Sequence, residues 1–421
     1  MSQSHERSAL QRSMRSDAEH IIHRSIQAVL PDQAVLHALQ GHKFPGRVFL
    51  VSVGKAAWQM AAAASRCLGE TITAGVVITK YGHVRAPIAN IACYEAGHPV
   101  PDANSFQATR AALKLVQGLS EQDTVLFLLS GGGSALFELP LVPAEELQHI
   151  TNQLLASGAD ILEINTIRKR LSGVKGGRFA QHCAPARIFS VVLSDILGDP
   201  LDMIASGPAY PDRSTCTQAR SIAEKYHLSL STQAASLLKQ ETPKLLPHAE
   251  TCIIGSVHEL CRAAAETCQV LGYQPLILTD RLCCQAREAG SFLASIAQSH
   301  ATTDTPLAFL AGGETVVRLT GSGKGGRNQE LALAAAHGIA GLSNVFVFSV
   351  GSDGTDGPTD AAGGMADGMT ACLLAEHGFS IPKVLEDNDA YHALKEVDGL
   401  IMTGPTGTNV NDVSAVLIRP T

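Results

Sequence analysis

The residues most able to do chemistry gather between positions 311 and 367, where polar, glycine-rich loops follow apolar runs. The first loop, 321–330 (GSGKGGRNQE), carries the cations Lys324 and Arg327 among closely spaced glycines. Such a loop exposes backbone N–H groups to an anion, and a following helix N-terminus adds partial positive charge. The pattern predicts a site for phosphate or carboxylate. Its predicted contacts, besides Arg327, are Gly323, Lys324, Gly325, Gly326 and Asn328.

The second loop, 351–360 (GSDGTDGPTD), is rich in carboxylates. Asp353, Asp356 and Asp360 offer the hard oxygen atoms that Mg²⁺ takes as ligands. We predict Asp353 and Asp356 as metal ligands. Cations for phosphate and carboxylates for a metal, close together in the sequence, indicate phosphoryl transfer.

Two further glycine-containing loops follow apolar runs in the first half of the chain. Gly54 and Lys55 follow the run 47–53, and Lys55 could bind a ligand or be an ordinary surface lysine. The G-x-x-x-x-G-K-[ST] spacing of a Walker A loop is absent from the sequence. The loop 130–134 (SGGGS) follows the run 124–129, and its consecutive glycines cost chain entropy. They predict a ligand against the backbone, with tight helix–strand packing as the alternative. The contacts would be Ser130, Gly131, Gly132, Gly133 and Ser134.

Two single residues complete the candidates of the first half. Asp195 follows the apolar run 187–193 and could be a base, a metal ligand or a turn cap. His98 stands out among the histidines because it precedes Pro99, and we interpret it as a loop-packing residue rather than a catalytic one.

The loop 321–326 also matches the dinucleotide-binding pattern G-x-G-x-x-G. Arg327, Asn328 and Gln329 follow it, however, in place of the small residues that let such a helix pack on its strand. This match is therefore weak evidence for a nicotinamide cofactor. The G-x-S-x-G elbow of serine hydrolases is absent from the sequence.

The elements that must position these loops alternate between short apolar runs and stretches of helical periodicity. That alternation predicts an α/β fold with mostly parallel sheets in three-layer α/β/α domains. A chain of 421 residues is too long for one core. A proline-containing connector at 241–249 predicts domains of 1–240 and 241–421.

Composition excludes several classes of partner. A net charge of −7 argues against nucleic acid and anionic membranes. The 10 cysteines include no C-x-x-C pair, so we expect reduced thiols and no zinc site. A polar N-terminus without a signal-peptide core, and the lack of 18 consecutive apolar residues, predict a cytoplasmic protein with no membrane partner. The sequence leaves the oligomeric state open, a homodimer being one option.

Nine motifs occur in an order that resembles one known family. They are VGKAA (53–57), LLSGGGSA (128–135), NTIRKRLSGVKGGR (165–178), LSDILGDP (193–200), ASGP (205–208), GGET (312–315), GGRNQE (325–330), GSDGTDGPTDAAG (351–363) and GTNVND (407–412). Together they resemble the type 2 glycerate kinase family, whose C-terminal half contains the MOFRL region, here about 305–418. One departure is Val257, where the family pattern leads us to expect Asn after Ser256.

The resemblance implies ATP-dependent, Mg²⁺-assisted phosphorylation of D-glycerate, with 2-phosphoglycerate as the expected product, in a cleft between the two domains. It also implies that Lys55 and Arg327 are active-site groups. On this reading Asp195 is the base that accepts the hydroxyl proton, and Asn409 of the closing motif contacts substrate. An NAD(P)H-dependent hydroxypyruvate reductase and a non-catalytic sensor of small acids remain the alternatives.

Overall fold

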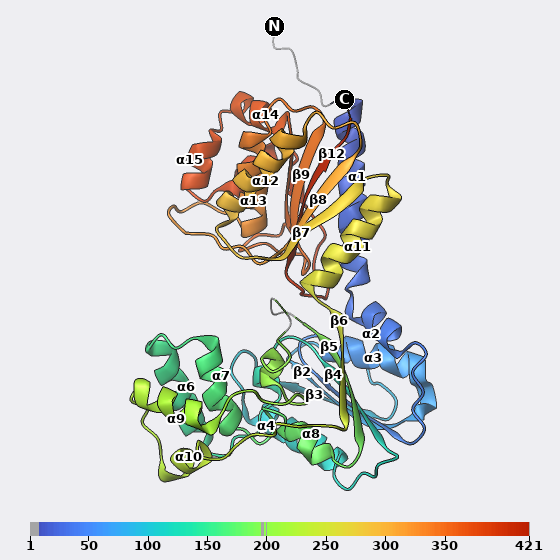
Figure 1. Ribbon diagram of the computed structural model, residues 1–421, viewed down its shortest axis with the longest axis vertical. Helices are drawn as coiled ribbons and strands as arrows, with labels where there is room; N and C mark the ends of the chain where they lie inside the picture. Colours follow the sequence, from blue (N-terminus) through green and yellow to red (C-terminus); the bar gives the residue numbers. More distant parts are fainter. Residues whose placement is uncertain (1–7, 195–197, 199, 421) are drawn as a thin grey trace. The chain divides into compact units, whose positions relative to one another are not determined.

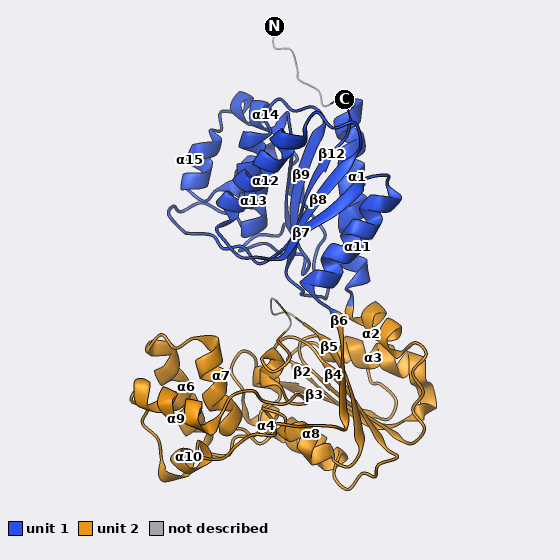
Figure 2. Ribbon diagram, in the orientation of Figure 1, with its two compact units in different colours: residues 1–30, 255–421 blue, residues 31–254 orange. Residues whose placement is uncertain are grey.

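The computed structural model describes residues 8–194, 198 and 200–420, which divide into two units (Figures 1 and 2). Residues 31–254 form one, here called the N-terminal unit. Residues up to Leu30 and from Gly255 on form the other, the C-terminal unit. The chain therefore passes between the units twice, at limits other than the predicted boundary between 240 and 241. Helix α1 (Ala9–Ala28) and strand β6 (Ala249–Gly255) account for the difference, because each joins the unit opposite to the predicted one.

The sheet of the N-terminal unit has six strands in the order β3-β2-β1-β4-β5-β6. Its first five strands pair in parallel. The central strands β1 and β4 are buried along their whole length, as continuous apolar runs predict for parallel strands covered on both faces. The strands are β1 (Val48–Val53), β2 (Ile72–Lys80), β3 (Ile91–Ala96), β4 (Thr124–Leu129), β5 (Arg187–Leu193) and β6.

Helices cover both faces of this sheet. Helices α4 (Ala103–Leu115) and α8 (Arg178–Cys183) pack on the face that carries Phe49, Val51 and Val53. Helix α3 (Ala57–Leu68) packs on β1 and β2 from the other face, next to α2 (Pro31–Leu39). A separate small core joins the helices of a lateral lobe, at the left of the orange unit in Figure 2. These are α6 (Ala144–Ala156), α7 (Ile161–Arg170), α9 (Cys216–Lys225) and α10 (Thr232–Leu237).

The sheet of the C-terminal unit has the order β11-β10-β9-β12-β8-β7 and is mixed. Strands β7 and β8 pair in parallel, but β12 is antiparallel to both β8 and β9, between which it lies. Strand β10 is antiparallel to β9 and β11. The strands are β7 (Gln274–Leu282), β8 (Leu307–Gly313), β9 (Val345–Gly351), β10 (Gly363–Asp367), β11 (Leu400–Ile401) and β12 (Asp412–Ile418).

Two helical layers enclose this second sheet. Helix α1 packs beside α11 (Val257–Val270) on one face, and α12 (Ala286–His300) and α13 (Arg327–Gly338) pack on the other (Figure 1). The amphipathic α1 begins with a capping box, in which the Ser8 side chain accepts a hydrogen bond from the Gln11 N–H. Short helices complete the unit, namely α14 (Thr370–Glu376), α15 (Ile381–Glu386) and α16 (Ala390–Glu396).

The α/β class and the layered architecture predicted from the sequence are confirmed. Two details differ. The stretch 315–319, whose apolar residues would suit a strand, forms only a single bridge at Val316, while β10 forms at 363–367. Glycines and a methionine dominate β10, so its composition gave no strand signal. Among the described residues, no helix has the length and apolar character needed to cross a membrane.

Candidate active site

The first group of predicted site residues lies where the strand order of the N-terminal sheet reverses. Strands β2 and β3 lie on one side of β1, and β4 lies on the other. Open α/β sheets bind ligands in the crevice at the carboxyl ends of the strands at such a switch point. Lys55 follows β1, and the loop 130–134 follows β4. The structure therefore brings these two loops together at the edge of the sheet where a ligand is expected.

Lys55 is joined to the glycine-rich loop through its backbone. Its N–H donates to the Gly131 carbonyl at 2.9 Å, and the Ala56 N–H donates to Ser130 Oγ at 3.1 Å. The lysine side chain is exposed and makes no ion pair with any described residue. Its ammonium group thus has no carboxylate partner in the described part of the chain, and its backbone is held by hydrogen bonds to the glycine-rich loop.

Close packing accounts for two glycines of this loop. A Cβ on Gly132, whose φ is +86°, would lie 3.0 Å from the His98 ring, and one on Gly133 would lie 2.6 Å from Ala205 Cβ. The packing alternative considered for these glycines therefore holds at both positions. Their roles, and those of Ser130, Gly131 and Ser134, as ligand contacts stay predictions.

His98 packs in this loop cluster, as the sequence suggested. Burial lowers the pKa of its imidazole, and the nearby ammonium groups of Lys55 and Lys80 lower it further. A neutral imidazole at pH 7 adds no charge to the cations around it.

Sequence reasoning assigned no role to a group of residues that holds Ser134. The Ser134 and Ser206 hydroxyls are 3.3 Å apart, and Ser206 Oγ donates to Asn165 Oδ1 at 2.9 Å. Ser206 and its neighbour Ala205 have φ angles of 62° and 49°, a left-handed conformation that costs energy in residues with a side chain. Strain of this kind is concentrated at functional sites.

Two cations also hold the carbonyl of Ser134. Arg168 Nη2 donates to it at 3.2 Å, and the buried Lys175 Nζ donates at 2.8 Å. Burial lowers the pKa of Lys175 to about 8, although Glu138, 3.0 Å away, opposes that shift. The signal for these residues was present in the motifs 165–178 and 205–208, but a motif does not tell which of its side chains face a neighbouring loop.

The predicted base Asp195 lies outside the described residues, which end at Ser194 before this loop. Its role stays a prediction.

The second group of predicted residues lies in the C-terminal unit, around the first turn of α13. Arg327, the first residue of this helix, donates two hydrogen bonds to Asp412, at 2.6 and 3.0 Å. It donates a third to Glu314 at 3.0 Å, and Asn411 Nδ2 donates to the same glutamate at 3.1 Å. Burial raises the pKa of Asp412, although its bonds with Arg327 act in the opposite direction. Unlike Lys55, Arg327 is already bound to two carboxylates.

Asp356, a predicted metal ligand, lies at the same helix end and binds its amides. Its Oδ1 accepts from the Asn328 N–H at 3.1 Å and its Oδ2 from the Gln329 N–H at 2.9 Å, so it caps α13. Its side chain is buried, and burial raises its pKa to about 6 against these hydrogen bonds. Each oxygen of this carboxylate thus already accepts a helix amide, and its predicted role as a metal ligand stays a prediction.

Asp353 fits the metal-ligand role better. It is half-buried, and one of its oxygens accepts from the Thr355 N–H at 2.9 Å. Its Oδ1 and that of Asp412 each lie 3.4 Å from the position that a Cβ on Gly351 would take, so both carboxylates face one small space. Within the described ranges, no three His, Cys, Asp or Glu side chains are placed to hold a metal ion. Magnesium that is bound largely through substrate phosphates needs only one or two protein carboxylates.

The loop 321–326 is largely used in internal contacts. The Gly323 N–H donates to the Asp387 carbonyl at 2.8 Å, and the Lys324 N–H donates to Asp389 Oδ1 at 2.9 Å. The Lys324 ammonium lies over the Tyr391 ring at 4.4 Å. These two amides are therefore bound to protein atoms, and the predicted phosphate cradle of Gly323, Lys324, Gly325 and Gly326 is not supported at its first two positions.

The two predicted asparagines differ in accessibility. Asn328 is buried and bonds to Ser349 and Asp356, so it supports the helix end. Asn409 is exposed in the loop before β12. Lys55 and Arg327 belong to different units, and their sharing of one cleft stays a prediction.

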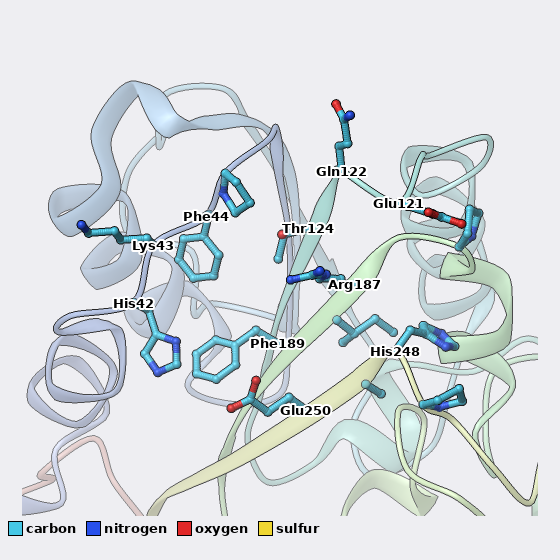
Figure 3. A pocket seen from close by; sticks show the side chains of 15 residues that line it. His42, Lys43, Phe44, Glu121, Gln122, Thr124, Arg187, Phe189, His248 and Glu250 are labelled. Atoms are coloured by element: carbon cyan, nitrogen blue, oxygen red, sulfur yellow. The ribbon is translucent and has the colours of Figure 1, made fainter.

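A pocket of about 800 Å³ lies at the amino ends of the N-terminal strands and contains none of these residues. Figure 3 shows Arg187 in its middle and the rings of His42, Phe44 and Phe189 along one side. Arg187 is the first residue of β5, at the edge of the sheet opposite to Lys55. This pocket is thus separate from the candidate site.

Comparison with known proteins places the chain in a family. A model described as a domain of unknown function, DUF4147, matches residues 17–239, and the MOFRL family model matches residues 307–412. The chain is 53% identical to a D-glycerate 2-kinase of Thermotoga maritima, over 96% of this chain and 99% of that protein. It is 40% identical to a glycerate 2-kinase of Pyrococcus horikoshii, over 94% and 96% of the two chains.

A solved structure matches over the same extent. The crystal structure of a glycerate kinase from Thermotoga maritima superimposes with a TM-score of 0.93 at 52% identity, and the match covers 97% of this chain and 100% of that one. The motif resemblance, the two family models and these full-length matches agree, and the chain belongs to the glycerate kinase family with a C-terminal MOFRL region.

Proposed function

We propose that this enzyme transfers the γ-phosphoryl group of ATP, with Mg²⁺, to the 2-hydroxyl group of D-glycerate. The observation that carries this proposal is the 53% identity, over nearly the full length of both chains, to a D-glycerate 2-kinase. Phosphoryl transfer demands mainly positioning and charge neutralisation, with little covalent chemistry from the protein. Lys55 and the loop 130–134, at the switch point of the N-terminal sheet, could provide this positioning and charge neutralisation.

Lys55 is assigned to the phosphoryl group during transfer. Its ammonium group has no carboxylate partner among the described residues and stands on a loop anchored to Gly131 and Ser130. A point charge that is already placed stabilises developing negative charge without reorganisation.

Arg327 is assigned to the glycerate carboxylate or the transferring phosphate, which a guanidinium fork can bind bidentately. Its N–H donor to Glu314 is the one that a substrate would reach, because Glu314 is half exposed whereas Asp412 is buried. In this proposal the substrate carboxylate takes the place of Glu314, while Asp412 keeps the guanidinium oriented.

Magnesium, when bound with the nucleotide, would neutralise charge on the phosphate oxygens, and Asp353 is the candidate protein ligand. Asp195 is retained as the proposed base. A cytoplasmic location and a homodimer stay predictions.

The alternative function, a hydroxypyruvate reductase, is not supported by the loop that matches a dinucleotide-binding pattern. The loop 321–326 does not follow a strand directly, because β8 ends at Gly313, and its amides bind the segment 387–389. A dinucleotide fingerprint needs the strand to lead straight into the glycine turn.

The test is an ADP-release assay with ATP, Mg²⁺ and D-glycerate. We expect turnover that requires D-glycerate and disappears with EDTA. No ADP above background, together with NADH consumption on hydroxypyruvate, would contradict the proposal and favour the reductase.

A further inference from the structure

A small pocket of about 120 Å³ lies beside Lys55 at the carboxyl edge of the N-terminal sheet. It opens between the first turn of α3 and the segment that follows β2. Its lining residues are Lys55, Trp58, Gln59, Gly82, His83 and Arg85. Of these residues, only Lys55 belongs to a motif found in the sequence.

Three cations around this pocket make no ion pair with the described residues. Among the residues that the structure describes, Lys55, Lys80 and Arg85 make no ion pair, in a chain whose net charge is −7. Two carboxylates contact the segment after β2, and both are used locally. Glu95 accepts from the Val84 N–H at 2.9 Å, and Asp102 accepts from the Tyr81 hydroxyl at 2.6 Å.

The segment that carries Arg85 is held firmly in place. Trp58 Nε1 donates to the Ala86 carbonyl at 2.8 Å, and His83 Nδ1 donates to the Lys55 carbonyl at 3.0 Å. The Arg85 guanidinium lies over the Trp58 ring, 5.7 Å from its centroid. Stacking on an indole orients an arginine fork while leaving its N–H groups free to bind an anion.

The first turn of α3 also favours an anion in this pocket. Its N-cap is Ala56, whose N–H donates to Ser130 Oγ, and the Ala57 N–H donates to the Gly54 carbonyl, so only the later amides of the first turn face a ligand. A helix N-terminus attracts negative charge through its amides and its dipole. The helix N-terminus, the cations that make no ion pair with described residues and the pocket between them all favour an anionic ligand.

We propose that Lys55, Trp58, His83 and Arg85, here called the Trp58 shelf, bind the polyphosphate of the nucleoside triphosphate donor. This inference rests on the proposed kinase function and assigns the donor's phosphates to the N-terminal unit. Arg85 binds phosphate oxygens with its fork, and Lys55 meets the terminal phosphate. In this proposal the acceptor and the metal ion bind in the C-terminal unit, where carboxylates surround Arg327.

The test uses the intrinsic fluorescence of Trp58, the only tryptophan in the chain. The full-length protein is titrated with ATP and, separately, with inorganic tripolyphosphate, both without D-glycerate. We expect each to change the fluorescence saturably, because each places phosphates beside the guanidinium that covers the indole. Arg85→Gln should weaken both affinities about tenfold or more, since it removes a charge-assisted contact.

Two controls accompany this titration. Trp58→Phe identifies the source of the signal. Arg187→Gln removes an exposed arginine at the opposite edge of the same sheet and should leave both affinities unchanged. In turnover, Arg85→Gln should raise the KM for ATP about tenfold and leave the KM for D-glycerate unchanged.

Three results would overturn the shelf. One is an Arg85→Gln protein that binds tripolyphosphate as tightly as the wild type. Another is a fluorescence response to ATP but not to tripolyphosphate, which would mean that the adenine ring of ATP, and not its phosphates, binds beside Trp58. The third is fluorescence that stays constant at ATP concentrations saturating turnover. Saturable binding of both probes without any glycerate-dependent ADP release would support the shelf and contradict only the proposed function.

Discussion

Lys55 and Arg327 are the two cations expected at the active site, and their surroundings are opposite. Lys55 follows a central strand of a parallel sheet, is exposed and has no carboxylate partner among the described residues. Arg327 begins a helix beside a mixed sheet and is bound by Asp412 and Glu314. Lys55 can bind an anion directly, whereas Arg327 must first release one of its carboxylate partners.

This difference separates two uses of positive charge. An exposed, unpaired lysine contributes little to folding, so its removal should affect only catalysis. A guanidinium bonded to a buried carboxylate also supports the structure, because its removal leaves that carboxylate without compensation. The mutations below test whether the two cations differ in this way.

The largest combined effect is expected for Arg327→Ala. We expect kcat/KM to fall about 10²–10⁴-fold, as for other electrostatic deletions, and the free energy of unfolding to fall by about 3 kcal/mol. Enzyme kinetics and urea unfolding measure the two quantities. Arg327→Ala combined with Asp412→Asn should recover much of the stability but not the activity. Wild-type stability of the single variant would show that the ion pair has no structural role.

Lys55→Ala should lose as much activity without losing stability. We again expect a fall of about 10²–10⁴ in kcat/KM, with an unfolding midpoint within experimental error of the wild type. Lys43→Ala is the matched control, because Lys43 is exposed at the opposite edge of the same sheet. Activity of Lys55→Ala within about tenfold of the wild type would remove this lysine from the mechanism.

Asp356→Asn distinguishes a helix cap from a metal ligand. The pKa of Asp356 is raised from 3.8 to about 6, so the folded state binds more protons than the unfolded state between these values. Stability contributed by this group is therefore greatest at low pH and declines as pH rises through about 6. Relative to the variant, the wild type should lose up to about 3 kcal/mol between pH 4 and pH 7.

Urea unfolding of both proteins across this pH range measures that difference. The Mg²⁺ concentration for half-maximal activity should stay within about twofold of the wild type if Asp356 binds only helix amides, because Asn can still cap the helix. A large increase in that concentration, with no pH-dependent stability difference, would restore the metal-ligand role.

Glu314→Gln should give the smallest effect. Glu314 is half exposed, so its ion pair with Arg327 contributes only about 0.2–1 kcal/mol. If the substrate replaces Glu314, weakening this pair should lower the KM for D-glycerate up to about fivefold at unchanged kcat. A higher KM would mean that Glu314 supports substrate binding rather than competing with it.

Much of the N-terminal unit could be predicted from the sequence, because its buried strands are continuous apolar runs that end in glycine-rich turns. The runs 47–53, 124–129 and 187–193 all became neighbouring parallel strands. This pattern also predicts the position of Lys55 at the carboxyl end of β1. The contact between Trp58 and Arg85 could not be predicted, because it depends on the conformations of the segments that follow β1 and β2.

The C-terminal unit was harder to predict for physical reasons. An apolar run such as 412–418 has the same pattern in a parallel and an antiparallel strand, so the direction of β12 could not be read. The amphipathic pattern of α1 does not name its partner, which is α11, far along the chain. The contact of Asp356 with the N-terminus of α13 could not be predicted, because a carboxylate in a glycine-rich loop has the same sequence pattern whether it binds a cation or a helix end.

The proposed glycerate 2-kinase activity is best tested by phosphorus NMR of the product formed from ATP, Mg²⁺ and D-glycerate. Phosphate on the 2-hydroxyl group is coupled to one carbon-bound proton, so we expect a new phosphomonoester doublet that grows with ADP. A triplet would place the phosphate on the 3-hydroxyl group and contradict the proposed product. The absence of any new phosphomonoester signal would contradict the kinase itself.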